Sequence, residues 1–137
     1  MTSKLATVNS IFAVIMTAIA QALGGWDLAL RVLVALVILD YATGVMVAIL
    51  EKNLSSEIGY KGLFKKVMIF ALVYVAVLAD QATNTDILRT ITIMFYIANE
   101  AISVLENAGK LGVPYPAQLK NILVQLKAKN NGEGEHP

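Results

Sequence analysis

Apolar residues fall in four long runs along the chain, separated by short polar stretches. The runs cover about residues 5–23, 28–50, 64–82 and 87–107. An α-helix rises about 1.5 Å per residue, so about 20 residues cross the roughly 30 Å hydrocarbon core of a bilayer. The pattern therefore predicts an all-α integral membrane protein with four transmembrane helices.

The first run leaves other interpretations open. It follows Lys4 and ends at Gly24, and the sequence Ala-Gln-Ala at 20–22 resembles a signal-peptidase site. A run that is cleaved, or that lies flat at the interface, would leave three transmembrane helices. Its length favours a spanning helix. A weak polar face runs along it, formed by Ser10, Thr17 and Gln21.

The fourth run differs from the others because polar residues recur along it at spacings of three and four, which places them on one helix face. They are Arg89, Thr92, Tyr96, Asn99, Ser103 and Glu106, with Glu100 beside Asn99. A charged group at mid-bilayer costs roughly 2.5–3.5 kcal/mol on insertion scales, so this face is expected to meet protein or water rather than lipid. It lines an aqueous path in one state of the protein, or it simply packs against polar groups of neighbouring helices.

Asp40 lies in the interior of the second run, where an acid needs a partner. It either faces a pore or forms a hydrogen bond with a neighbouring helix, in which case it can be protonated. Gly44 and Ala48 lie four residues apart on one side of the same run. Small residues at this spacing predict the close approach of another helix.

The connection from Glu51 to Lys66 is the most basic loop, and its lysines are Lys52, Lys61, Lys65 and Lys66. The positive-inside rule places this loop in the cytoplasm, and with four spans both termini are cytoplasmic as well. The lysines either set only the topology or also hold anionic lipid headgroups. The third and fourth runs are joined by an acidic stretch without lysine, which fits the outer side. There we expect Arg89 to pair with Asp80 or Asp86, or to extend to the surface.

The fourth helix is expected to end before Val113-Pro114-Tyr115-Pro116, because neither proline can continue it. Residues 117–129 then place leucine and isoleucine on one face and lysine elsewhere, which predicts a short amphipathic helix. It would lie on the membrane or pair with a copy of itself. The sequence thus divides into a transmembrane domain, 1–112, and a cytoplasmic amphipathic helix with a polar tail, 113–137.

Composition narrows the function. Apolar residues make up 57% of the chain and charged residues 15%, against about 25% charged in soluble domains. A net charge of +1 gives no reason to expect nucleic acid as a partner. The chain has no cysteine, and its single histidine, His136, lies in the polar tail. With no nucleophile constellation, metal-ligand spacing or cofactor motif, we expect no catalytic residue, no metal, no cofactor and no enzyme activity.

Three sequence clusters in register resemble the toxin secretion/phage lysis holins, small bacteriophage membrane proteins. They are Asp40-Tyr-Ala-Thr-Gly44, the loop from Ser55 to Lys66, and the run from Asn99 to Asn107 that continues to Gly112-Val-Pro-Tyr-Pro116. The resemblance covers about residues 28–126. The matching positions are Asp40, Gly44, Lys65, Lys66, Glu100, Ser103, Glu106 and Asn107.

The resemblance implies a protein that accumulates in the bacterial cytoplasmic membrane, forms homo-oligomers and opens lesions at a set time. An endolysin, or in relatives a toxin, then passes through, and needs no direct contact with the holin. An antiholin is a further partner that the family suggests. Combined with the residue pattern, this gives a hypothesis in which Asp40 and the polar side of the first helix cover the polar face of the fourth until the lesion opens.

Two other classes of function remain. A selective ion channel or small transporter would need a constriction or a broken helix at mid-depth. No Gly/Pro break interrupts the four runs. A non-conducting scaffold would use the spans as an anchor and the C-terminal helix to recruit a partner.

Overall fold

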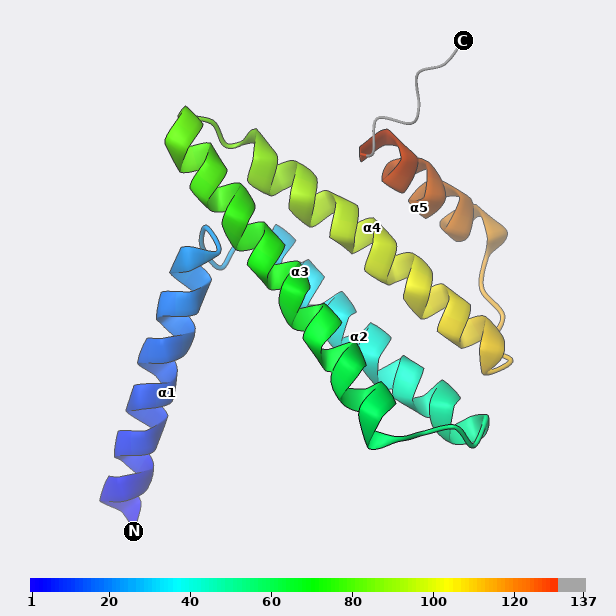
Figure 1. The fold of residues 1–137 in the computed structure, drawn as a ribbon, viewed down its shortest axis with the longest axis horizontal. Coiled ribbons are helices and arrows are strands. Elements are labelled where there is room, and N and C mark those ends of the chain that lie inside the picture. Colours follow the sequence, from blue (N-terminus) through cyan, green and yellow to red (C-terminus); the bar gives the residue numbers. More distant parts are fainter. Residues whose placement is uncertain (131–137) are drawn as a thin grey trace.

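The computed structural model describes residues 1–130, and these residues form five α-helices and no strand. The helices are α1 (Thr2–Ala22), α2 (Leu28–Leu50), α3 (Ser56–Thr83), α4 (Ile87–Lys110) and α5 (Ala117–Asn130) (Figure 1). The first four are long and apolar enough to cross a membrane. The prediction of an all-α protein with four candidate membrane spans is confirmed. The polar tail, with His136, lies outside the described residues.

Helix α3 begins at Ser56 and not near residue 64. Ser55 has extended backbone and caps the helix, because its hydroxyl accepts a hydrogen bond from the backbone N–H of Ile58 at 3.2 Å. Glu57 in the first turn also favours a helix start at this point. Most of the stretch from Glu51 to Lys66 therefore belongs to α3, and only residues 51–55 connect it to α2.

Helices α2, α3 and α4 pack into a bundle with a continuous apolar core. On α2 the buried positions recur at spacings of three, four and seven, as expected for one face of a packed helix. They are Leu30, Leu33, Val37, Asp40 and Val47. The buried positions of α3 are Ile69, Val73, Ala76, Val77 and Asp80. Ile93 is the α4 residue of the core cluster. The buried positions of α4 also include Glu100, so the buried face of each of the three helices contains a carboxylate.

Three glycines of the bundle face a neighbouring helix, and a methyl group at each would make ordinary van der Waals contacts. A methyl group at Gly59 or Gly62 of α3 would lie 3.6 or 3.5 Å from the side chain of Tyr41 on α2. The Tyr41 hydroxyl donates to the carbonyl of Gly59 at 3.1 Å. Gly44 of α2 faces α4, where a methyl group would lie 3.9 Å from the amide nitrogen of Asn107.

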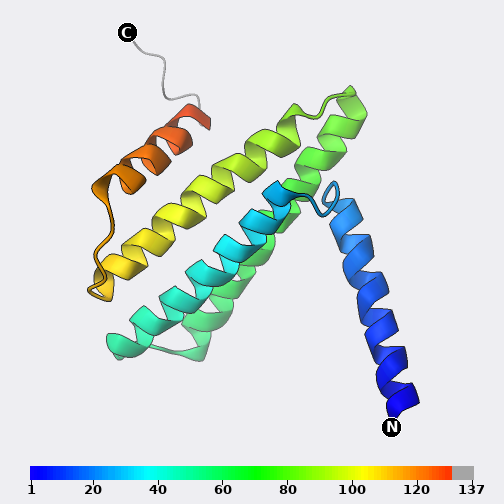
Figure 2. The same cartoon turned by 180° about the vertical axis from the view of Figure 1, so that it is seen from behind.

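Helix α1 stands away from the bundle, and none of its residues is buried (Figures 1 and 2). Its polar face does not cover α4, so that part of the hypothesis is wrong for this arrangement. The physical reason is local: Ser10 and Thr17 donate to the carbonyls of Ala6 and Ala13 in their own helix, and so require no partner elsewhere.

Helix α4 lies between the α2/α3 pair and α5 (Figures 1 and 2). After α4 the chain turns at Gly112, which has a φ of +81°, and α5 returns alongside α4. Helix α5 therefore packs against α4.

Ile93→Ala should lower the free energy of unfolding by about 2–5 kcal/mol, the usual cost of truncating an enclosed isoleucine. Ile93 is 0% exposed, whereas Ile91 on the same helix is 43% exposed, so Ile91→Ala is the matched control. Thermal unfolding in detergent micelles, followed by circular dichroism, measures both. Equal losses in the two variants would contradict the packing of α4.

Candidate functional site

Three helices each contribute one charged side chain to a buried ion cluster, formed by Asp40 of α2, Lys66 of α3 and Glu100 of α4. The ammonium of Lys66 contacts the Asp40 carboxylate and lies 2.6 Å from Glu100 Oε2. Asp40 is 7% exposed and Glu100 2% exposed. One ammonium thus joins two carboxylates from two other helices.

Asn107 extends the ion cluster toward the end of α4. Its amide nitrogen donates to Asp40 Oδ1 at 3.0 Å and lies 3.3 Å from the backbone carbonyl of the same residue. The same nitrogen lies 2.8 Å from the hydroxyl of Thr43. Both oxygens of the Asp40 carboxylate therefore have partners, Lys66 on one and Asn107 on the other.

The ion cluster is costly to bury and costly to break. Moving charges out of water carries a penalty of several kcal/mol per ion, which attraction at short range offsets only while every partner is present. Removing one partner of a buried ion pair typically costs about 3–5 kcal/mol, because the other charge is left uncompensated. The cluster therefore holds α2, α3 and α4 in one relative position.

An open cavity of about 260 Å³ leads from the end of the bundle near the α2–α3 connection to this cluster. It is lined by the exposed Leu54 and Ile58 and by Asp40, Lys66 and Ser103. Since a water molecule in the liquid occupies about 30 Å³, the cavity has room for several. The charged groups are thus buried but have an aqueous approach from one end.

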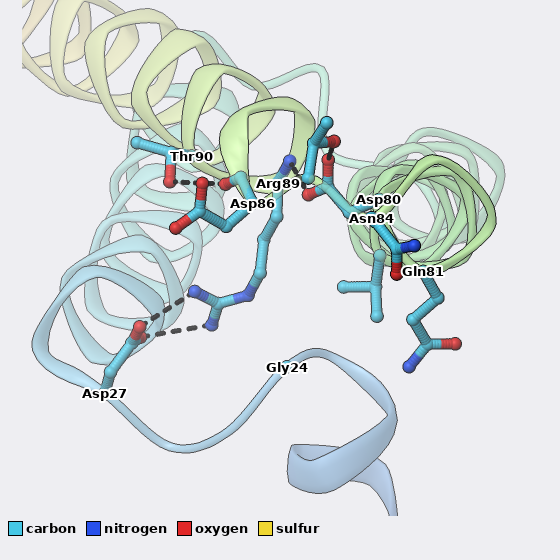
Figure 3. A pocket seen from close by; sticks show the side chains of 10 residues that line it. Gly24, Asp27, Asp80, Gln81, Asn84, Asp86, Arg89 and Thr90 are labelled. Carbon is cyan, nitrogen blue, oxygen red and sulfur yellow. Dashed lines mark hydrogen bonds and ion pairs between the residues drawn. The ribbon is translucent and has the colours of Figure 1, made fainter.

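A second polar group, the Arg89 clamp, joins the start of α4 to the α1–α2 turn (Figure 3). The Arg89 guanidinium donates to both Asp27 carboxylate oxygens, at 2.8 and 3.1 Å. It also donates to the carbonyls of Leu23 at 2.6 Å and Gly25 at 3.2 Å. Asp27 in turn caps α2 by accepting from the N–H of Leu30 at 3.0 Å. One side chain thus fixes a turn more than 60 residues earlier in the chain.

The hydrogen bonds from Arg89 lower the pKa of Asp27, and the Leu30 cap adds to this. An acid whose pKa is depressed in the folded state contributes stability above its unfolded pKa and loses it as pH falls through the folded value. The Arg89 clamp is therefore complete at neutral pH and weakens only in acid.

The expectation that Arg89 pairs with Asp80 or Asp86 is wrong. The buried Asp80 carboxylate caps α4: it accepts from the backbone N–H groups of Leu88 at 3.0 Å and Arg89 at 2.8 Å, and from the hydroxyl of Thr85 at 2.7 Å. Because these local donors occupy Asp80, the guanidinium reaches the carboxylate in the α1–α2 turn instead (Figure 3).

The face of α4 that is directed into the bundle differs slightly from the predicted polar face. Arg89 and Glu100 make interhelical ion pairs, and Tyr96 packs against the core. Thr92 donates to the Leu88 carbonyl of its own helix, Asn99 is half-buried, and Glu106 is exposed. The face directed into the bundle is better described by spacings of four and three: Arg89, Ile93, Tyr96, Glu100, Ser103 and Asn107.

The four lysines grouped as a basic loop have different surroundings. Lys52 lies in the α2–α3 connection, Lys61 pairs with Glu57 on the surface of α3 at 2.9 Å, and Lys65 is exposed. Lys66 points into the bundle, which the loop assignment missed. Its signal was available in the spacing, because residues 66, 69, 73, 76 and 80 form one helix face.

Within residues 1–130, no group of three or more acidic, histidine or cysteine side chains is arranged to hold a metal ion. The charges of the ion cluster are satisfied mainly by each other. What the arrangement offers chemically is a charged centre inside an apolar helical bundle, reachable by water from one end.

Comparison with protein families matches residues 17–128 to the bacteriophage holin family. The chain belongs to this family. A probable holin of Bacillus phage phi105 is 34% identical over 107 residues, which are 77% of this chain and 79% of the relative. An uncharacterized protein of Clostridium perfringens is 43% identical over 110 residues, 79% of this chain and 82% of the relative. No solved structure matches this holin. With four apolar helices, the holin is a multi-pass protein of the cytoplasmic membrane.

Lys66→Met should destabilise the holin by about 3–5 kcal/mol, because two buried carboxylates lose their shared ammonium. Lys65→Met is the matched control, since Lys65 is the adjacent residue and is exposed. Thermal unfolding in micelles provides the comparison. If both variants unfold at the same temperature as the wild type, Lys66 does not hold the bundle together.

Gly24→Ala should open the Arg89 clamp. A methyl group there would overlap the Arg89 guanidinium, and the φ of +93° is itself unfavourable for alanine. Gly25→Ala is the control, because Gly25 has a similar φ of +107° but no atom within 4 Å of the added methyl. We expect faster proteolysis of the α1–α2 turn in Gly24→Ala than in Gly25→Ala. Identical cleavage rates would show that the clamp does not order this turn.

Proposed function

We propose that this holin self-associates in the bacterial cytoplasmic membrane and, at a programmed time, opens lesions through which an endolysin or a toxin leaves the cell. Membership of the holin family and the similarity to a probable phage holin support this proposal. The structural observation that carries it is the ion cluster of Asp40, Lys66 and Glu100 inside an otherwise apolar bundle.

The charged groups of the ion cluster can be stabilised in two arrangements of the helices, one closed and one open. In the closed bundle the three charged groups satisfy one another away from lipid. If the helices separate, each group needs water or a polar partner, because a charge facing lipid is costly. An open assembly must therefore turn these groups toward an aqueous path. Two arrangements of one sequence that differ by a few kcal/mol can interconvert abruptly when subunit density changes.

Apolar surface available for self-association is exposed on α1, α2 and α3. Helix α1 has no buried residue, and large apolar side chains are exposed along the outer sides of α2 and α3. In a bilayer these surfaces face lipid or other copies of the chain. The exposed lysines near the α2–α3 connection, Lys52, Lys61 and Lys65, favour a cytoplasmic position for that end and for both termini.

Regulated expression in a bacterium, with and without a co-expressed endolysin, tests the function. The proposal predicts an abrupt loss of respiration in both cultures and clearing only in the culture that makes endolysin. A folded cytoplasmic reporter enzyme should also be released. Passage of ions without release of the enzyme would contradict the proposal and indicate a selective channel.

The triple variant Asp40→Leu, Lys66→Met and Glu100→Leu should separate folding from lesion formation. Replacing a whole buried ion network by apolar residues is often neutral or stabilising, so the variant should accumulate in the membrane. It lacks the groups that must meet water, and we expect reporter release to be delayed or abolished. Lys65→Met with Glu106→Leu, which removes exposed charges from α3 and α4, is the control. Unchanged lysis timing at equal membrane levels of the triple variant would refute a role of the cluster in opening.

A further inference from the structure

The charges of the ion cluster do not balance. Two carboxylates, Asp40 and Glu100, contact a single ammonium, that of Lys66. The other group bonded to Asp40 is the neutral amide of Asn107. If both acids were ionised, the cluster would hold one uncompensated negative charge at a site where Asp40 is 7% and Glu100 2% exposed.

Within residues 1–130, no second cation forms an ion pair with the cluster. On α2 the nearby titratable group is Tyr41, whose hydroxyl is bonded to Gly59, and on α4 it is Tyr96, one turn before Glu100. On α3 the adjacent Lys65 is exposed. Helix α5 packs against α4, but no ion pair found within residues 1–130 joins α5 to the cluster. Arg89 is engaged by Asp27.

We propose that the ion cluster binds one exchangeable proton, shared between the carboxyl groups of Asp40 and Glu100, when the bundle is closed. Two buried acids that contact one ammonium lack a second counter-charge, and a proton held by the pair would supply it. The proton makes the cluster neutral: one carboxylate, one carboxylic acid and one ammonium.

The cavity described above gives this proton a route. It reaches Asp40, Lys66 and Ser103 from the end of the bundle near Leu54 and Ile58. The bound proton therefore equilibrates with the solution on that side, which is the cytoplasm in the orientation proposed above. At the opposite end of the bundle the Arg89 clamp joins α4 to the α1–α2 turn. The polar pocket at the clamp shares no lining residue with the cavity (Figure 3).

Proton binding also links opening to pH, a consequence that rests on the proposed function. In an open, hydrated assembly the carboxyls separate and ionise, so opening releases the proton. Loss of one proton changes an equilibrium constant by up to about tenfold per pH unit, and a higher pH favours the state that has released it. Alkaline solution on the cavity side should therefore favour opening.

Infrared spectroscopy of the full-length protein in lipid vesicles tests the proton directly. At neutral pH the wild type should show one protonated-carboxyl band that disappears at alkaline pH. Asp40→Asn and Glu100→Gln each leave one carboxylate and one ammonium, so both variants should lack the band while retaining helical content. Glu106→Gln is the control, because Glu106 is exposed on the same helix as Glu100, and it should keep the band.

Absence of a protonated-carboxyl band from the wild type at neutral pH would overturn the proton site. So would a band that survives in Asp40→Asn or Glu100→Gln. Should a variant fail to fold, the wild-type titration still decides the question.

Release of a dye from vesicles prepared at different internal and external pH tests the link to opening. The release rate of the wild type should rise up to about tenfold per pH unit on the cavity side, and Glu100→Gln should not respond. A protonated wild-type carboxyl together with no dye release at any pH would leave the proton site intact and count against lesion formation.

Discussion

The structure depends on one interaction, the contact of the Lys66 ammonium with the carboxylates of Asp40 and Glu100. Because none of these groups can be left alone in an apolar environment, the contact fixes the rotation and the axial position of α2, α3 and α4 together. The apolar core lies next to it: Val37 lies one turn before Asp40 and Ile69 one turn after Lys66, each on the buried face. The ion contact and the apolar core therefore favour the same arrangement of the three helices.

The Arg89 clamp complements the ion cluster at the other end of α4. It joins the α1–α2 turn to the bundle while α1 itself makes no buried contact, so the first helix is held only at its base. A holin built in this way has a defined three-helix bundle and one unattached apolar helix. Ion pairing inside the bundle and a free apolar surface outside it are both compatible with the proposed self-association in the membrane.

Sequence patterns predict the helices well, because their length and hydropathy respond to a single constraint, the thickness of the bilayer. The need of Asp40 for a partner also follows from the sequence. The sequence does not show that this partner is Lys66, because Lys66 follows Lys65 and resembles a lysine at the membrane interface. The Ser55 cap starts α3 at Ser56, and Lys66 therefore lies inside the helix and not in a loop. For Arg89 the spacing suggests Asp80, Asp86 or the surface and not Asp27, because it does not reveal that backbone N–H groups occupy Asp80.

Labelling of a single cysteine tests whether the inner face of the bundle is closed before lysis and meets water afterwards. The chain has no native cysteine, so Val37→Cys, on the buried face of α2, reports this face alone, and the exposed Ile38→Cys reports the opposite face. We expect a water-soluble maleimide to modify position 37 only after lesions form and to leave position 38 unmodified throughout. Modification of position 38 upon lysis, with position 37 still protected, would contradict it.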